Sequence, residues 1–541
     1  MGLLLLLPPV AALLAGLAAA APRPAVPSLA GPRPGARPLA ALSAATTRLS
    51  GVLVSAILLA TGVALLRHRG AVPTLGGDLL RADALSALML TVVGAVGLTA
   101  TWAGLEPRTS PAASAHGSGA TRSERRYAAL VCVFLGAMAI AVTTDNLGVL
   151  WVAVEATTIA TAFLVGHRGG ARSLEAAWKY VVLGSVGIAI ALLGTVLLYA
   201  ASRSAGEPTL SWTRLVSGEL PLDPALVKVA AGLAVLGFAT KAGLAPMHSW
   251  LPDAHSQAPA PVSGLMSGVL LAVAFYAILR VRAIAAVVIG PGLVRGLLLT
   301  AGLGSLAVAG ALILRQRDHK RMLAYSSIEH MGVLAVGAAV GGPVALAAVL
   351  LHLIGHGLAK ASLFVVAGRM LASEGTTTIA EVRGLLSRRA DLAVPLVVGM
   401  AALLGFPPFA LFFSEVAIVL AGWRAGLGWA MALVVALLLV VVAGLVRATA
   451  AMTLGPAQRP PDQAHAVHDE RTTTTTSAPD GSAPVAVATL APAPAPPQAH
   501  GADRGPVLPL VLALGTTAVI GFVATPVGDV LTRAAAVLGL S

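Results

Sequence analysis

The chain has 541 residues, of which 57% are hydrophobic and only 11% are charged. Soluble domains contain roughly 45–50% apolar and about 25% charged residues, so this composition excludes a soluble globular protein. The 36 Lys and Arg residues outnumber the 23 Asp and Glu residues. They lie between long apolar runs, which favours membrane topology over nucleic-acid binding as their role. A single cysteine, Cys132, cannot form an intrachain disulfide or a multi-cysteine metal site.

Long apolar stretches follow one another along the chain and predict its membrane-spanning helices. A span needs about 20 apolar residues, and this length identifies about 14 candidates. In chain order they lie near residues 2–21, 48–66, 83–103, 127–143, 146–166, 176–200, 225–245, 259–279, 296–314, 322–341, 344–371, 392–421, 427–449 and 507–531. The first stretch also has the length of a signal peptide, but no basic residue precedes it, which favours a retained helix. We therefore expect an all-α polytopic protein of the cell membrane.

Composition also divides the chain into regions. Residues 1–124 contain the first helices and a Pro-rich linker at 22–46, and residues 125–425 form a core of spans that carries buried charges. A further helix at 426–454 precedes a low-complexity segment at 455–505, and the last helix lies within 506–541. The composition of 455–505 cannot bury enough apolar surface to order itself, so we expect a cytoplasmic linker, with partner binding as the alternative.

The distribution of basic residues predicts the orientation of these spans. One set of alternate loops carries about twice as many Lys and Arg residues as the other set, and basic loops stay in the cytoplasm. With an even number of spans, both termini are then expected on the extracytoplasmic side.

Two charged residues inside predicted spans, Glu155 and Lys241, are candidates for a proton site. A charge at the bilayer centre costs at least about 2.5–3.5 kcal/mol, so such residues usually serve a function. Pro246 follows Lys241 and must break its helix, which frees backbone carbonyls at membrane depth. A glutamate that approaches or leaves a buried lysine changes the lysine's affinity for its proton. The alternative is a static ion pair that holds two helices together.

A stripe of basic side chains predicts a second site. His352, His356 and Lys360 are spaced four residues apart and therefore share one helical face. The lysine would repel a metal ion, so the stripe favours a proton wire over a metal site. As an alternative, backbone carbonyls and neighbouring helices could satisfy each histidine in a structural role. Glu415 follows a mid-span break expected at Pro407–Pro408 and adds a further charge on the apolar side.

Glu329 and His330 lie one to two turns into the helix that follows a cytoplasmic cluster of charges. They are either a point of proton uptake or a capping and packing pair.

The chain has no GxxxxGK[ST] phosphate loop, no GxGxxG after a strand and no cysteine cluster. Neither ATP nor a redox centre within this chain is therefore expected to drive transport. The energy would come from an ion gradient or from an attached protein complex.

Four motifs in the core resemble those of a known family. They are KAGLAPMHSWLPDAHSQAPAPVSG at 241–264, DHKRMLAYSSIEHMG at 318–332, HGLAKASLFVVAG at 356–368 and GFPPF at 405–409. Residues 125–425 thereby resemble the antiporter-like, proton-conducting subunits shared by respiratory complex I, group 4 hydrogenases and Mrp antiporters, with the hydrogenase-4 type nearest. The resemblance implies fourteen helices with two inverted five-helix repeats, in which helices 7 and 12 are broken.

The resemblance also implies a role for each buried charge. Glu155 matches the helix 5 glutamate of the family, and Lys241 matches the helix 7 lysine that this glutamate modulates. His356 and Lys360 match the helix 11 relay, and Glu415 matches the charged residue of helix 12.

One position departs from the family pattern, and it affects the function that the resemblance implies. Many pumping subunits carry Lys or His on helix 8, whereas this chain has Ala272. Water would therefore have to bridge the centre of the row of buried polar residues.

The function that the resemblance implies is transport of H⁺, or of Na⁺, by a membrane-arm subunit. Other membrane-arm subunits and a peripheral redox arm would be its partners and would hold the flavin, iron–sulfur or nickel–iron centres, with no cofactor in this chain. The alternatives are an Mrp-type Na⁺/H⁺ antiporter subunit and a structural subunit that does not pump.

Overall fold

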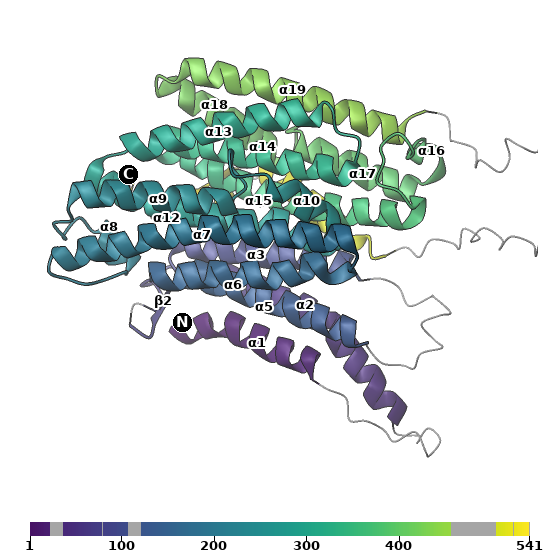
Figure 1. The fold of residues 1–541 in the computed structure, drawn as a ribbon, viewed down its shortest axis with the longest axis horizontal. Coiled ribbons are helices and arrows are strands. Elements are labelled where there is room, and N and C mark those ends of the chain that lie inside the picture. Colours follow the sequence, from purple (N-terminus) through teal and green to yellow (C-terminus); the bar gives the residue numbers. More distant parts are fainter. Residues whose placement is uncertain (22–35, 78, 106–120, 456–504, 523, 540–541) are drawn as a thin grey trace, which may run out of the picture.

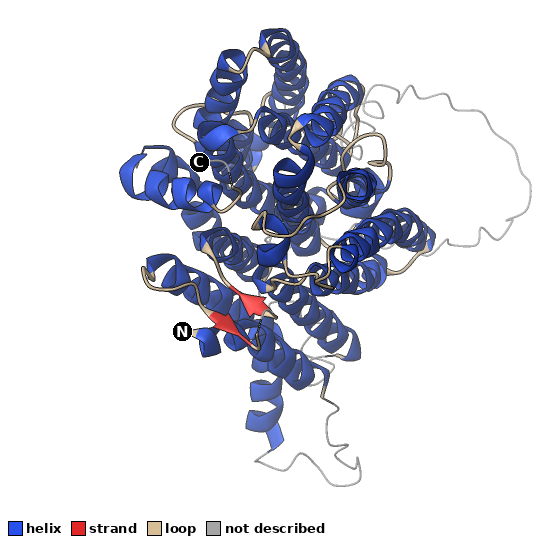
Figure 2. Cartoon of the chain, turned by 90° about the vertical axis from the view of Figure 1, so that its left-hand side faces the viewer, coloured by secondary structure: helices blue, strands red, loops and turns tan. Residues whose placement is uncertain are grey.

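The computed structural model describes residues 1–21, 36–77, 79–105, 121–455, 505–522 and 524–539. Its helices run side by side along the longest axis of the molecule (Figure 1), and Figure 2 looks along them onto a small hairpin at one end. Within the described residues, twelve helices are long and apolar enough to cross a membrane. Two shorter apolar helices, Ala390–Leu403 and Leu508–Gly521, accompany them. The chain is a multi-pass membrane protein.

The elements fall into two groups on either side of a break after Lys241. The first group contains, in chain order, η1 (Gly2–Leu6), α1 (Leu7–Ala20), α2 (Ala36–Arg67), β1 (Thr74–Leu75), β2 (Leu80–Arg81), α3 (Ala84–Ala103), α5 (Arg122–Thr143), α6 (Leu147–Val165), η2 (Gly166–Arg168), α7 (Ala171–Ser204), α8 (Trp212–Val216) and α9 (Pro224–Lys241). Strands β1 and β2 pair antiparallel, with Thr74 opposite Arg81.

The second group begins with a short half-helix. It contains α10 (Trp250–Gln257), α11 (Ala260–Leu265), the π-helical turn η3 (Met266–Leu270), α12 (Leu271–Ile289), α13 (Gly292–Ile313), α14 (His319–Val340), α15 (Gly342–Glu374), α16 (Leu385–Arg388), α17 (Ala390–Leu403), α18 (Ala410–Arg424), α19 (Gly428–Thr453), α21 (Leu508–Phe522) and α22 (Ala524–Ala536). The helix expected at 507–531 thus comprises α21 and α22.

The linker predicted at 22–46 is partly helical. Helix α2 begins at Ala36, so residues 36–46 extend the span expected at 48–66. The prediction was wrong there because this stretch is rich in alanine and leucine, which favour a helix. Its last proline, Pro38, lies in the first turn, where a helix tolerates proline. Residues 22–35 of that linker and residues 456–504 of the second predicted linker lie outside the described part of the chain.

Two helices break where the sequence places a proline two or three residues after a glycine. Helix α9 ends at Lys241, and Gly243 has a φ of +74°, a left-handed conformation that favours glycine. The Trp250 indole donates to the carbonyl of Thr240 (3.0 Å), which satisfies one acceptor freed by the break. The span expected at 392–421 likewise consists of α17 and α18, which are separated by residues 404–409 with Gly405 at a φ of +65°.

Helix α12 lies at the centre of the molecule. Every residue from Leu271 to Ala285 is at most 5% exposed. Around it, glycines allow neighbouring helices to approach closely: a Cβ on Gly237 of α9 would lie 2.4 Å from the Ala191 nitrogen of α7. Small residues at such contacts supply the van der Waals packing that holds helices together in a membrane.

The two ends of the described chain lie at the same end of the bundle. Gly2 lies against Thr74 of the hairpin. At the other terminus, Arg533 of α22 donates to the carbonyl of Leu66 (3.2 Å), at the end of α2 that leads into the hairpin. Figure 2 accordingly shows the labels of both termini on the face that carries the strands.

Candidate functional site

Ionisable side chains gather in the interior of the second group of helices and at its boundary with the first. The fully buried ones, each at most 2% exposed, include Lys241, His255, Lys320, Glu329, His330, His352, His356 and Lys360. Glu155 and Glu415 are partly buried. Because a buried charge or an unpaired buried polar group is costly, the hydrogen bonds of these side chains decide what the site can do.

Lys241 donates two hydrogen bonds at the end of α9. Its Nζ contacts Thr158 Oγ1 of α6 (2.7 Å) and Tyr180 Oη of α7 (2.6 Å), and it lies 4.5 Å from the centre of the Tyr180 ring. The Tyr180 hydroxyl also shares a hydrogen bond with Thr161 Oγ1 (2.5 Å). These hydroxyl partners could not be predicted from the sequence, since nothing in their spacing shows that three helices bring them together.

Glu155 lies close to this group without bonding to Lys241. Its Oε1 accepts a hydrogen bond from Ser185 Oγ (3.2 Å), and its Oε2 is buried without a hydrogen-bond partner among the described residues. The charges of Glu155 and Lys241 interact electrostatically, but the two side chains form no direct ion pair within the part of the chain that the structure describes. The static ion pair considered as an alternative is therefore not the arrangement observed.

Lys360 and Glu329 belong to a second group on α14 and α15. Lys360 Nζ donates to the carbonyl of Leu323 (2.6 Å) and to the hydroxyl of Ser326, both one helix away on α14. Glu329 lies 3.3 Å from His330 through Oε2 and Nε2, whereas its Oε1 is buried without a hydrogen-bond partner in the described chain. A lysine and a glutamate are therefore buried in the same group without neutralising each other in a direct ion pair.

Three imidazole rings continue this group. His330 lies 5.2 Å from His352 and 5.1 Å from His356 between ring centres, and His330 Nδ1 is 3.2 Å from His352 Nε2. His352 Nδ1 is in turn 3.0 Å from Ser414 Oγ of α18. The predicted stripe thus reaches α14 and α18 through His352, while neither ring nitrogen of His356 has a hydrogen-bond partner among the described residues.

The hydrogen bonds of Ser414 select one direction for this series of side chains when its hydroxyl points to the backbone. Ser414 Oγ also lies within hydrogen-bond distance of the carbonyl of Leu411 (2.9 Å), and when its one hydrogen is donated there, His352 donates to Ser414 through Nδ1. In that arrangement His352 Nε2 is an acceptor, and His330 Nδ1 donates to it. His330 Nε2 consequently faces Glu329 either as a free acceptor or as the second N–H of a cation. One mobile proton can therefore be held at the Glu329–His330 contact.

Glu415 lies beside these histidines, and the three side chains together have the composition of a candidate metal-ligand group. One ligand atom each from His330, His352 and Glu415 lies within 4.8 Å of the others. The facing nitrogens of the two histidines are already bonded to each other, and His352 uses its other nitrogen for Ser414. In this hydrogen-bonded arrangement the histidine nitrogens are used for each other and for Ser414.

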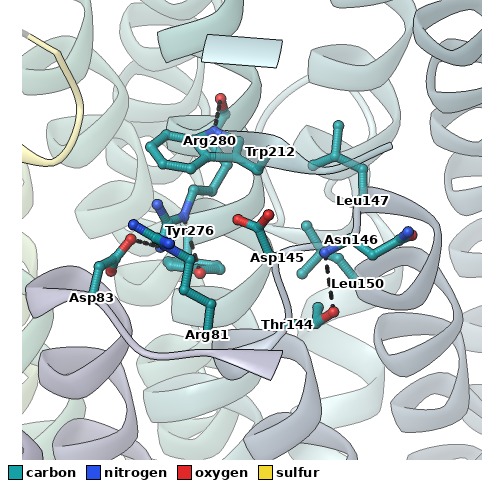
Figure 3. A pocket seen from close by; sticks show the side chains of 10 residues that line it. All are labelled: Arg81, Asp83, Thr144, Asp145, Asn146, Leu147, Leu150, Trp212, Tyr276 and Arg280. Carbon is teal, nitrogen blue, oxygen red and sulfur yellow. Dashed lines mark hydrogen bonds and ion pairs between the residues drawn. The ribbon is translucent and has the colours of Figure 1, made fainter. Parts of the chain in front are cut away.

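A separate polar cluster lines a small pocket near the hairpin (Figure 3). Arg280 of α12 pairs with Asp83 (Nη2 to Oδ2, 2.8 Å) and donates to Tyr276 Oη (3.0 Å). Across the pocket, Asp145 accepts hydrogen bonds from the hydroxyls of Ser211 and Thr213. The pocket has a volume of about 10 Å³, which is room for about one water molecule.

Comparisons with known proteins identify what this arrangement resembles. A family model described as NADH:quinone oxidoreductase/Mrp antiporter, TM, matches residues 144–440. The hydrogenase-4 component F homolog of Methylacidiphilum infernorum is 42% identical over 298 residues, which cover 54% of this chain and 62% of the relative. NADH-quinone oxidoreductase subunit N of Desulforudis audaxviator is 34% identical over 307 residues, or 56% of this chain and 59% of that protein. The chain thus spans about 60% of the length of these relatives.

A solved structure shares the fold over nearly the whole length. A chain of the Mrp complex from a Dietzia species superposes with a TM-score of 0.75 at 22% sequence identity, over 99% of this chain and 97% of that one. The match includes the region of 144–440 that contains Glu155, Lys241, the histidine group and Glu415.

Proposed function

Because the chain belongs to the NADH:quinone oxidoreductase/Mrp antiporter family of membrane proteins, we propose that it is a proton-translocating membrane subunit of a redox-driven complex. The observation that carries this proposal is the series of buried ionisable side chains between Lys241 and Glu415. Buried charges with unpaired polar atoms cost stability, and a membrane protein retains them where ions or protons pass. The names of the two relatives, a hydrogenase-4 component and an NADH-quinone oxidoreductase subunit, support the redox-driven class.

In the proposed architecture the chain crosses the membrane fourteen times. The broken pair α17 and α18 would form one crossing and α21 another, in addition to the twelve long helices. Two inverted five-helix repeats would place the breaks after Lys241 and at 404–409 in corresponding positions. The common location of both chain ends and the excess of basic residues in alternate loops support extracytoplasmic termini in the cell membrane. Residues 125–425 would be the conducting core.

Proton transfer in this proposal begins at Lys241. When the Glu155 carboxylate moves towards the ammonium, it stabilises the charged form, and when it moves away, the desolvated lysine gives up its proton. Tyr180 and Thr158 hold the ammonium in place between these events and accept its hydrogen bonds. The unpaired Glu155 Oε2 is the atom available for that approach.

The second group would receive the proton and pass it on. Lys360 and His356 lie on the side of α15 that faces α14, and Glu329 with His330 can hold one proton. From there His330 donates to His352, which lies beside Glu415. Imidazole can accept a proton on one nitrogen and release one from the other. His352 would therefore take the proton on Nε2 and release one from Nδ1 to Ser414 Oγ, and the serine would pass on its own hydrogen after turning away from the Leu411 carbonyl.

Other chains would supply the redox chemistry. The only cysteine in this sequence, Cys132, is buried in α5 and cannot ligate an iron–sulfur cluster alone. We therefore assign flavin, iron–sulfur or nickel–iron centres to a peripheral redox arm, and we expect other membrane-arm subunits beside this chain.

The test uses the native assembly. It is purified from membranes in mild detergent, its chains are identified by mass spectrometry, and redox-driven acidification is measured after reconstitution into vesicles. Lys241→Ala should lower acidification by at least about tenfold while electron transfer continues, since proton transfer through a positioned group contributes that much or more. Lys228→Ala, on the exposed surface of the same helix, is the matched control. Equal acidification by the two variants would contradict the proposal and leave a structural, non-pumping subunit.

A second candidate function is that of an Mrp-type Na⁺/H⁺ antiporter subunit. The family description and the likeness to a chain of an Mrp complex favour it. In that case only other antiporter-like chains would co-purify, and vesicles would acidify in response to a Na⁺ gradient without any electron donor.

A further inference from the structure

Three side chains from different helices converge at one end of the histidine group. They are His330 of α14, His352 of α15 and Glu415 of α18, and one ligand atom of each lies within 4.8 Å of the other two. Both histidines are at most 2% exposed, whereas Glu415 is partly exposed. Two imidazoles and one carboxylate are a donor set found in zinc sites, where water takes the fourth position.

The facing nitrogens of the two histidines are spaced like two ligands of one metal ion. His330 Nδ1 and His352 Nε2 are 3.2 Å apart. Two nitrogens bound to one tetrahedral Zn²⁺ at about 2.0–2.1 Å are separated by about 3.3–3.4 Å. A metal ion can therefore replace the hydrogen between the rings at almost the same separation, once each ring turns its lone pair towards the ion.

Each histidine also has a hydrogen-bond partner on its outer nitrogen. His352 Nδ1 is 3.0 Å from Ser414 Oγ, and His330 Nε2 is 3.3 Å from Glu329 Oε2. A histidine that binds a metal through one nitrogen almost always donates from the other to such a partner, which fixes its tautomer and its ring orientation. The metal-bound form needs hydrogen on His352 Nδ1 and on His330 Nε2, and an oxygen acceptor lies at both positions.

The carboxylate of Glu415 can move to complete the ligand set. It forms no hydrogen bond or ion pair with any residue that the structure describes, and its Oε2 lies against Gly405, where a Cβ would be 2.7 Å away. Ligands of a tetrahedral ion are about 3.3 Å apart, so the carboxylate must approach the two nitrogens by up to about 1.5 Å. Rotation of the side chain supplies this movement, since Gly405 has no side chain to hinder it.

The charges around these residues favour a divalent cation. Glu329 and Glu415 supply two carboxylates, and Lys360 supplies one ammonium. Lys360 follows His352 by two turns of α15, about 12 Å at 1.5 Å per residue, and its Nζ is held by the carbonyl of Leu323 (2.6 Å). Its repulsion therefore acts over a longer distance than the attraction of the two carboxylates.

We propose that His330, His352 and Glu415 form a binding site for one transition-metal dication of the Zn²⁺ class. Mg²⁺ and Ca²⁺ do not compete for it, because they prefer oxygen ligands and this site offers two nitrogens. The ion occupies the position of the hydrogen between His330 and His352. It therefore blocks the transfer of a proton from one ring to the other, a consequence that rests on the proposed function.

Measurement of metal binding tests the site. The native assembly, purified without a histidine tag, is equilibrated with Zn²⁺ and its zinc content is measured by elemental mass spectrometry. His352→Asn keeps an N–H for Ser414 but lacks Nε2, and Glu415→Gln keeps the shape but loses the charge. At unchanged subunit composition each should bind about one Zn²⁺ fewer per copy of this chain, through an affinity at least about tenfold lower. His356→Asn is the matched control, because His356 is equally buried on the same helix but lies outside the ligand set; it should bind Zn²⁺ like wild type.

Two results would overturn the site. One is Zn²⁺ binding by His352→Asn and Glu415→Gln that equals that of wild type. The other is an equal loss in His356→Asn, which would indicate capture of the ion by the histidine group as a whole.

A second measurement separates the metal site from the proposed function. Zn²⁺ at a concentration that fills the site should lower redox-driven acidification by wild-type vesicles by about tenfold or more, and a chelator should restore it. The same concentration of Mg²⁺ should have no effect. If Zn²⁺ binds with the expected dependence on the ligands while acidification continues, the metal site stands and the proposed passage of protons from His330 to His352 is wrong.

Discussion

The buried ion pair between Asp83 and Arg280 allows a quantitative prediction about stability. Their side chains are 8% and 6% exposed, and at 2.8 Å their attraction is about 6 kcal/mol for an effective dielectric constant of about 20. Removing one charge leaves the other buried, so Asp83→Asn should lower the free energy of unfolding by about 3–5 kcal/mol. Asp83 also caps α3 by accepting from the Ser86 nitrogen (2.8 Å), a role that asparagine can keep and alanine cannot. Asp83→Ala should therefore cost about 1 kcal/mol more than Asp83→Asn.

The measurement is unfolding of the purified chain in mild detergent by increasing dodecyl sulfate, followed by tryptophan fluorescence, since the Arg280 guanidinium lies 4.1 Å from the Trp212 ring. Asp223→Asn, at the exposed N-cap of α9, is the control and should change stability by less than about 0.5 kcal/mol. The double variant Asp83→Asn/Arg280→Met should regain most of the loss, because neither charge is then buried alone. A single variant as stable as wild type, or a double variant less stable than Asp83→Asn, would refute the reasoning.

Three further predictions concern the half-helix, a helix contact and the first charged group. Lys320→Met should lower the free energy of unfolding by about 2 kcal/mol, because two backbone carbonyls lose their hydrogen-bond donor. The melting temperature of the assembly checks this, and an unchanged melting temperature would contradict it. Gly237→Leu should prevent accumulation of the folded chain in membranes, since even a Cβ would approach the Ala191 nitrogen to 2.4 Å; normal accumulation would disprove the close contact. Glu155→Gln should keep the hydrogen bond from Ser185 and the assembly but slow vesicle acidification, and an unaltered rate would show that its charge is not used.

The spans and their breaks could be predicted from the sequence because both depend on local properties. Hydropathy over about 20 residues identifies a span whatever it packs against, and proline removes a hydrogen-bond donor wherever it occurs. The start of α2 at Ala36 was missed because nearby prolines outweighed the helix-favouring residues that follow them. The separation of α17 from α18 was expected as a break but not as a six-residue gap, since the length of a gap depends on tertiary contacts.

The charged groups were also predictable as single residues, while their partners were not. Lys241 is conspicuous in an apolar run, whereas its acceptors on α6 and α7 are ordinary hydroxyls that only the folded chain brings together. The burial of His255 could not be expected from the sequence, because this histidine lies in a polar stretch. Its burial and its unpaired Nε2 appear only when α10 is folded into the core. The pairing of Arg280 with Asp83 likewise joins helices distant in the chain.

In the proposed function, the arrangement in which His330 donates to His352 and His352 donates to Ser414 would limit how often protons can pass along these residues. A proton that reaches His330 at Nε2 and leaves from Nδ1 converts the ring to its other tautomer. A second proton cannot follow until the original tautomer is restored. Rotation of a ring packed 5.1–5.2 Å from two others is hindered, and Ser414 must turn away from the Leu411 carbonyl. Under the proposed function, each proton transfer would leave these residues in a state that cannot accept the next proton, so the series would have to be reset after every transfer and would not conduct as an open channel.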